Sequence, residues 1–134
     1  MPGFERTPRP SGPVVQGYGA SGFSVDGEIY QAVLLTPQRA RAWEAPALNE
    51  LEIEHVAAAL ALQPPPEFLI LGTGGRQVFP RGALVKALDE RGIGIEVMDS
   101  RAAARTWGVL RAEERWIAAA LMPLQLPLPL AGED

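Results

Sequence analysis

The stretch FLILGTGGRQVFPRGALVKALDERGIGIEVM, residues 68–98, decides the fold because it alternates strand, helix and strand. Its apolar run at residues 68–71 has no polar alternation, which is typical of a central strand buried on both faces. The apolar residues at 93–98 predict a second strand. Because a helical crossover in a sheet is right-handed and joins parallel strands, we expect these two strands to be parallel neighbours.

The helix between these strands has its own start and stop signals. Pro80 is placed to occupy the first helical turn, and Gly92 follows as a left-handed stop. Apolar side chains at helical spacing form the face that we expect to pack on the sheet, namely Leu84, Val85 and Leu88. Residues 68–98 therefore predict a parallel βαβ unit.

The flanking sequence predicts further elements. Asp26 and Gly27 separate two β-rich arms, at residues 22–25 and 28–35, and suit the positive φ angles of a type I′ hairpin turn. Apolar spacing predicts a helix over residues 53–60 that ends before Pro64. Another helix follows Asp99 or Ser100, either of which can cap it. For residues 116–122, the alanines favour a helix, whereas the short length and Pro123 favour a strand, which we predict.

The composition is that of one globular domain with a tail at each end. We predict a disordered N-terminal tail at residues 1–13, an α/β domain at residues 14–123 and a Pro/Leu-rich C-terminal tail at residues 124–134. The last segment fits either a polyproline II docking peptide or a partly ordered tail whose leucines cover the domain, and the second is favoured.

Charge and cysteine content exclude several classes of protein. The net charge of −4 argues against nucleic-acid binding, which needs a basic surface. No apolar run approaches the roughly 20 residues that span a bilayer, so a membrane-embedded protein is not expected. The chain has no cysteine, which removes thiol catalysis and disulfides and fits a reducing, cytoplasmic location. The start of the chain lacks the apolar core of a secretory signal.

The glycine-rich loop after the first strand has two interpretations. Backbone N–H groups at Gly72, Gly74 and Gly75, with the Thr73 hydroxyl, resemble an anion-binding nest ahead of a helix. The spacing matches neither G-x-G-x-x-G nor a P-loop, and glycine also serves where a chain leaves a buried strand sharply. The tight bend is favoured over a phosphate site.

This loop is nevertheless the best place for a ligand. The carboxyl ends of parallel strands meet at one sheet edge, so Asp99 and Ser100 should lie near the loop, and Arg105 should approach it. Asp99 is more often a helix cap, and Arg105 more often a surface charge. The candidate ligand-binding residues are Gly72, Thr73, Gly74, Gly75, Asp99, Ser100 and Arg105.

Other catalytic chemistry finds little support. His55 is the only histidine, and no further metal ligands are grouped with it. The serines lack a nucleophile-elbow setting. We therefore predict no catalytic residue, no metal and no cofactor.

Several segments together resemble a known family. They are LGTGG (71–75), GIGIEVMDS (92–100), AAARTWGVL (102–110), RWIAAALMP (115–123) and the hairpin GFSVDGEIYQAVLLTP (22–37) with Trp43. Their order is similar to that of a widespread family of small bacterial and archaeal proteins of unassigned biochemical function. Mitochondrial relatives of that family act as assembly factors for respiratory complex I. The resemblance covers roughly residues 14–123.

The resemblance implies a single three-layer α/β domain with a mixed central sheet, whose last strand runs antiparallel to the others, plus an N-terminal β-hairpin. Members often have Cys where this chain has Ala104, and an aromatic residue followed by Asn where it has Trp107 and Gly108. If that Cys or Asn reacts in relatives, this chain has lost the reaction. The departures favour a noncatalytic role.

Two functions of different kinds remain. The first is a noncatalytic protein-binding or assembly-factor-like domain, linked to respiratory complex assembly by the resemblance, with Arg105 and Trp107 as candidate partner contacts. The alternative is a small-anion or metabolite binder, or a minor enzyme, that uses the loop at Gly72–Gly75. A protein partner is expected, its identity is open, and so is self-association into a homo-oligomer.

Overall fold

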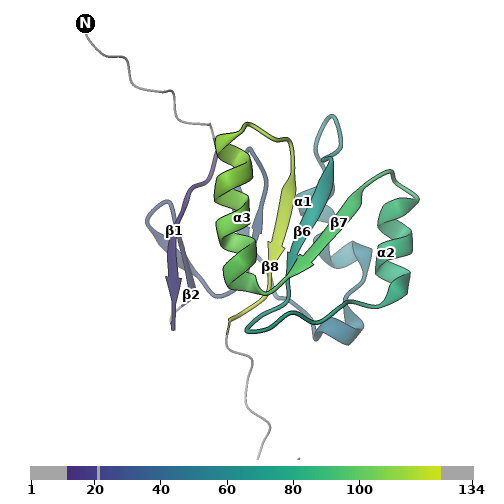
Figure 1. Ribbon diagram of the computed structural model, residues 1–134, viewed down its shortest axis with the longest axis horizontal. Coiled ribbons are helices and arrows are strands. Elements are labelled where there is room, and N and C mark those ends of the chain that lie inside the picture. Colours follow the sequence, from purple (N-terminus) through teal and green to yellow (C-terminus); the bar gives the residue numbers. More distant parts are fainter. Residues whose placement is uncertain (1–11, 21, 125–134) are drawn as a thin grey trace, which may run out of the picture.

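Helices cover both faces of a five-stranded sheet in the computed structural model, which describes residues 12–20 and 22–124. The strand order is β5-β4-β8-β6-β7. The strands are β4 (Val33–Leu35), β5 (Ala40–Ala42), β6 (Phe68–Gly72), β7 (Gly94–Met98) and β8 (Ala118–Leu121). The helical segments are η1 (Leu48–Glu50), η2 (Ile53–Val56), α1 (Ala57–Leu60), α2 (Gly82–Asp89) and α3 (Ser100–Ala112). Figure 1 shows α3 in front of the sheet and α1 behind it, which confirms the three-layer α/β fold.

The predicted parallel βαβ unit is present. β6 and β7 pair in parallel from Phe68↔Gly94 to Gly72↔Met98, with α2 as the crossover. β6 lies between β7 and β8, and apolar clusters cover both of its faces, so its residues from Leu69 to Gly72 are buried as the apolar run predicts.

The last strand corrects one detail of the predicted sheet. β8 pairs antiparallel with β4 but parallel with β6, so it does not run antiparallel to the other strands as a group. The reason is the connection: α3 is a second helical crossover, and a crossover from β7 returns the chain to the starting end of the sheet.

The N-terminal hairpin is part of a separate antiparallel sheet of three strands, in the order β1-β2-β3. They are β1 (Val15–Gly19), β2 (Gly22–Val25) and β3 (Glu28–Tyr30). Asp26 and Gly27 have φ angles of 50° and 87°, as the predicted type I′ turn requires. The predicted arm at residues 28–35 is divided, because β3 stays in the hairpin sheet while β4, buried at all three positions, enters the central sheet.

The helices lie where they were predicted, with differences in form at residues 53–60 and in detail at α2. The predicted helix at residues 53–60 is a 3₁₀ turn, η2, followed by the single turn α1. Arg81 has extended backbone angles and precedes the first helical residue, so Pro80 lies before the helix and not in its first turn. Leu84 and Leu88 are buried, whereas Val85 is 39% exposed because it lies about 100° around the helix from Leu84. Gly92 has a φ of 74° and ends the helix as predicted.

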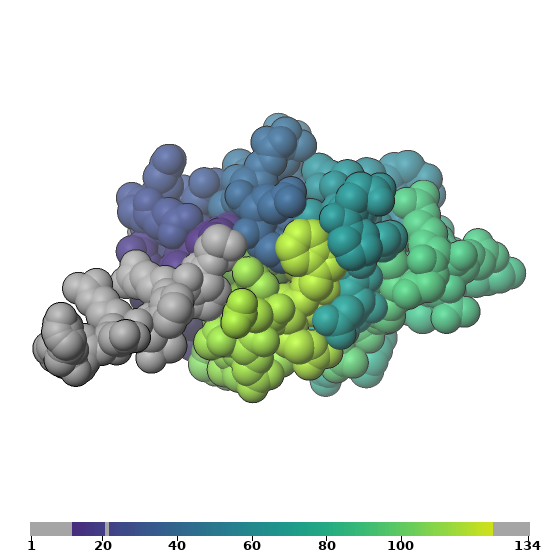
Figure 2. All heavy atoms as spheres, turned by 90° about the horizontal axis from the view of Figure 1, so that it is seen from above, coloured from purple at the N-terminus to yellow at the C-terminus, as the bar shows by residue number. Residues whose placement is uncertain are grey.

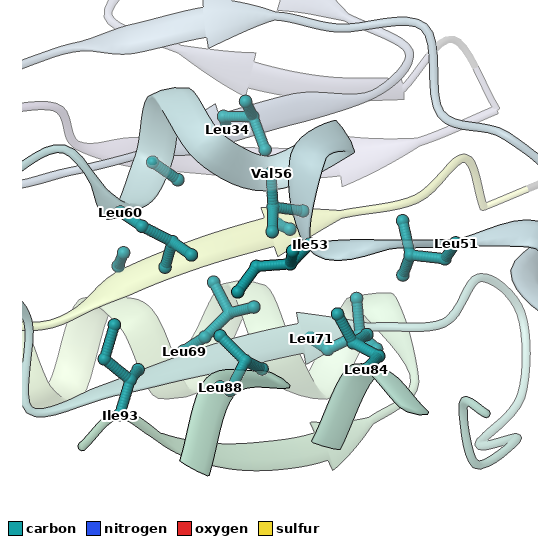
Figure 3. Close-up of a cluster of buried hydrophobic side chains, with 13 residues drawn as sticks. Leu34, Leu51, Ile53, Val56, Leu60, Leu69, Leu71, Leu84, Leu88 and Ile93 are labelled. Atoms are coloured by element: carbon teal, nitrogen blue, oxygen red, sulfur yellow. The ribbon is translucent and has the colours of Figure 1, made fainter. Parts of the chain in front are cut away.

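Two apolar clusters hold the layers together. Figure 3 shows the first, in which side chains from η2, α1 and α2 meet those of β6. Leu69 and Leu71 point into this cluster, while Ile70 belongs to the second cluster beneath α3. The alternation along β6 therefore supplies both faces of the core.

Figure 2 shows the end of the domain at which the turn between α3 and β8 lies beside the start of β6. There the Arg115 guanidinium donates to the Glu67 carboxylate at 2.9 Å. This hydrogen bond holds the pKa of Glu67 below its usual value. Both side chains are exposed, so the pair contributes little to stability.

The predicted tails at residues 1–13 and 124–134 lie outside the described residues except for Gly12, Pro13 and Leu124. Pro13 and Leu124 are buried against the domain. The division of the chain into a domain and two tails stays a prediction. Over residues 12–20 and 22–124, no helix has the length and apolar character needed to cross a membrane.

Candidate functional site

The loop after β6 uses its amides within the protein. The Gly74 N–H donates to the Ser100 Oγ at 2.8 Å, and the Ser100 N–H donates to the Gly74 carbonyl at 2.8 Å. The Thr73 N–H donates to the Met98 carbonyl at 2.9 Å. Because the Gly74 amide, one of the three predicted to bind an anion, and the neighbouring Thr73 amide already have partners, the geometry favours the corner-turning interpretation of this loop.

The Thr73 side chain closes the turn that follows. Its hydroxyl donates to the Arg76 carbonyl at 2.6 Å and accepts from the Val78 N–H at 3.1 Å. Thr73 is buried, so these bonds form away from water. The hydroxyl that was predicted to contact a ligand therefore holds the loop instead.

Ser100 connects the ends of two neighbouring strands. Its hydroxyl accepts from the Gly74 N–H and donates to the Met122 carbonyl at 2.8 Å, and the side chain is completely buried. Asp99 precedes α3, and its carboxylate accepts from the Ala102 N–H at 2.9 Å as an N-cap. The predicted grouping of Asp99 and Ser100 with the loop is thus real, but its bonds are structural.

The end of β6 tolerates no side chain at Gly72. A Cβ there would lie 2.8 Å from the Ser100 Oγ and 2.9 Å from the Ser100 Cα, on the helix backbone. We expect Gly72→Ala to lower the free energy of unfolding by about 1–3 kcal/mol, because α3 must move away from the sheet. Urea unfolding followed by circular dichroism measures the loss.

Gly108→Ala is the matched control for this substitution. A Cβ at Gly108 meets nothing within 4 Å, and alanine is the better helix former, so this variant should gain stability by up to about 1 kcal/mol. A Gly72→Ala protein as stable as the wild type would contradict the close packing described for β6 and α3.

The two predicted partner residues differ in exposure. Arg105 is exposed, and its guanidinium donates to the Tyr18 hydroxyl of β1 at 2.6 Å. Trp107 is 1% exposed, and its indole N–H donates to the Pro13 carbonyl at 3.4 Å. This burial gives no support to the prediction that Trp107 contacts a partner, because the face of α3 that carries it packs on the sheet.

A cleft of about 650 Å³ opens beside the loop, outside the predicted set of residues except for Thr73 and Gly75. It lies at the edge where β6 and β8 end, which Figure 1 shows at the bottom of the sheet. Its lining is Leu48, Asn49, Thr73, Gly75, Arg76, Val78, Phe79, Pro80, Arg81 and Leu124. We call this cleft the Phe79 groove.

Phe79 is the most exposed large apolar side chain among the described residues, at 73%. Val78 beside it is also exposed. Leu48 comes from η1 and Leu124 follows β8, so three distant parts of the chain form one apolar surface. Exposed apolar patches of this kind mark binding sites more often than isolated side chains do.

The sequence-based prediction considered only residues 72–75 of this loop and missed the groove. The signal was present in RQVFPR, residues 76–81, where Val78 and Phe79 stand in a loop between two arginines. A large apolar pair in a predicted loop belongs to no helix or strand face that would bury it. This pair is the sequence signal that could have identified an exposed apolar surface.

Metal chemistry has no evident site in the part of the chain that the structure describes. No three His, Cys, Asp or Glu side chains are grouped there as a metal site would require. The His55 Nδ1 accepts from the Glu52 N–H at 2.9 Å, which completes a capping box at η2.

The sequence profile of one family matches residues 15–122, from β1 to just beyond β8. This family is described as "Protein of unknown function (DUF498/DUF598)". The chain belongs to this family. The resemblance drawn from the motifs is thereby confirmed, and membership covers the whole central sheet and the hairpin sheet.

Two relatives and one solved structure show the range of the family. The Danio rerio protein named NADH dehydrogenase (ubiquinone) 1 alpha subcomplex assembly factor 3 is 31% identical over 114 residues, which cover 84% of this chain and 66% of that protein. An uncharacterized Rhodobacter capsulatus protein is 30% identical, over 87% of this chain and 90% of its own length. A Bordetella pertussis protein described as a Mth938-like domain, solved by NMR, matches with a TM-score of 0.76 at 25% identity, over 93% of this chain and 94% of its own.

The homology thus includes respiratory assembly factors and a bacterial protein of unassigned function. This chain spans just under two thirds of the length of the zebrafish assembly factor.

Proposed function

We propose that this protein is a noncatalytic, assembly-factor-like domain that binds another polypeptide in the Phe79 groove. One observation carries the proposal: a 73% exposed Phe79 stands among apolar neighbours at the sheet edge where α/β proteins place their ligands. Homology to complex I assembly factors supports the same class of function and extends the proposal to the assembly of a respiratory complex.

The shape of the groove favours a polypeptide over a small molecule. Small-molecule sites enclose most of their ligand's surface. The Phe79 groove leaves its largest side chain mostly in water, so an occupant must cover Phe79 from outside. Aromatic side chains are enriched at protein interfaces for this reason.

The alternative, an anion or metabolite held by Gly72–Gly75, has weaker support. The amides of Thr73 and Gly74 already have protein acceptors, and the Asp99 carboxylate caps α3. A ligand at this loop would have to displace those bonds. Arg105 contacts Tyr18, on the hairpin sheet.

A photocrosslinking amino acid at position 79 tests the proposal directly. The full chain carrying benzoylphenylalanine there should, in its source cells, crosslink to one or a few specific polypeptides that are identified by mass spectrometry. The same amino acid at position 109 is the control, because Val109 is 59% exposed on α3 and does not line the groove. Equal adducts from both positions would contradict the proposal, as would adducts within the chain or between two copies.

Phe79→Asp should weaken binding of the captured polypeptide by at least about tenfold, because a charge replaces the exposed apolar anchor. The unfolding free energy should change by less than about 0.5 kcal/mol, since the side chain is mostly in water already. Fluorescence anisotropy of the labelled partner measures the first effect, and urea unfolding the second. Val109→Asp should leave binding unchanged.

A further inference from the structure

We infer that the Phe79 groove selects a polypeptide segment that combines apolar side chains with an acidic one, and that Arg76 is the residue that recognises the acid. This inference rests on the proposed function and specifies the chemistry of the partner. It follows from the charges that line the groove and from the fixed position of the loop that carries them.

The lining of the groove is positive although the whole chain has a net charge of −4. Arg76 and Arg81 are among the lining residues, which include no Asp or Glu. Over residues 12–20 and 22–124, the single ion pair joins Arg115 to Glu67, so the Arg76 guanidinium has no acidic partner there. An incoming carboxylate would supply one.

The two arginines are not equivalent. The Arg81 guanidinium donates to the Asn49 carbonyl at 3.4 Å. Arg81 also lines a smaller cavity of about 170 Å³ together with Glu52 and Glu54, so acidic residues of the chain border the same cavity as Arg81. Arg76 is exposed and lines the Phe79 groove, where no Asp or Glu is among the lining residues, so we take its charge as the one that meets a partner.

Arg76 and the apolar anchors are close along the chain and held by the same side chain. The Thr73 hydroxyl bonds the Arg76 carbonyl and the Val78 N–H. Phe79 follows directly, so the acidic and apolar side chains of a partner must lie close together in space. One short segment meets both requirements, which distinguishes a peptide-like occupant from a uniformly apolar surface.

Selection of random peptides on the immobilised full chain tests this inference. A phage-displayed library of 12-residue peptides should yield binders that contain at least two large apolar residues and an Asp or Glu. The Arg76→Glu protein should enrich peptides with Lys or Arg in place of the acid, because the charge that reads this position is reversed. Arg101→Glu, at an exposed site on α3, is the matched control and should retain the acidic preference.

For a selected acidic peptide, Arg76→Glu should weaken binding about tenfold at low salt, and the difference should shrink as salt is raised. Arg101→Glu should bind as the wild type does. Fluorescence anisotropy of the labelled peptide gives both results, and this charge and salt dependence would not arise from a purely structural role of Arg76.

The possible failures are distinguishable. Apolar binders without an acidic preference, or an acidic preference that survives Arg76→Glu, would overturn this inference and leave the proposed function standing. No enrichment above a Phe79→Asp protein would overturn both. Binders lost only in Arg101→Glu would assign recognition to α3 and overturn both as well.

Discussion

Replacing Trp107 with alanine should lower the free energy of unfolding by about 3–5 kcal/mol, a large part of the stability of a domain of this size. The side chain is 1% exposed and belongs to the cluster between α3 and the sheet, so its removal leaves a cavity that the surrounding strands cannot fill. Chemical denaturation followed by circular dichroism measures the loss without relying on tryptophan fluorescence.

Trp116→Ala is the matched control for that experiment. Trp116 is only partly buried, and its indole N–H donates to the Pro64 carbonyl at 2.6 Å, so the loss should be clearly smaller. Should Trp107→Ala keep wild-type stability while losing a captured partner, the assignment of Trp107 to the core would be wrong and the original partner prediction right.

The second large effect is expected at Ser100. Ser100→Ala removes the acceptor of the Gly74 N–H and the donor to the Met122 carbonyl, both at a buried site. Leaving the two groups without partners should cost roughly 2–4 kcal/mol of unfolding free energy. Denaturation measures the cost, and amide hydrogen exchange should report faster exchange at Gly74.

Ser24→Ala provides a comparison at the surface. The Ser24 hydroxyl donates to the Gln16 Oε1 at 3.3 Å in an exposed part of the hairpin sheet, so its loss should change stability by less than about 0.5 kcal/mol. Unchanged exchange at Gly74 in Ser100→Ala would contradict the bond between loop and helix.

The parts of the fold that were predictable carry their signals locally. Three examples are the apolar strand at residues 68–71, the end of α2 at Gly92 and the N-cap of α3 at Asp99. Each depends only on residues that are adjacent in the sequence. The direction of β8 follows from the α3 crossover, so the antiparallel arrangement implied by the resemblance was wrong. The position of β8 between β4 and β6 was not predictable in this way, because it depends on which side of β6 the chain returns to. The division of residues 28–35 into two strands likewise depends on distant partners, because β3 pairs with β2 in the hairpin sheet and β4 pairs with β8 in the central sheet.

The candidate site was predictable in place but not in chemistry. The order of strands and helices puts Gly72–Gly75 next to Asp99 and Ser100, and the structure brings them together. Residue types do not show where their hydrogen bonds go, so a nest and a closed turn look alike in sequence. The groove needs Leu48, Phe79 and Leu124 side by side, a proximity that only the folded chain provides.

The Thr73 hydroxyl has a further consequence for the energetics of recognition. Since it fixes the backbone at Arg76 and Val78 in the free protein, the segment that carries Phe79 loses little conformational entropy when a partner arrives. If the proposed function holds, we expect the bound arrangement to resemble the resting one, so that association needs no prior rearrangement. We therefore expect Thr73 to influence affinity through the backbone that its hydroxyl holds in place.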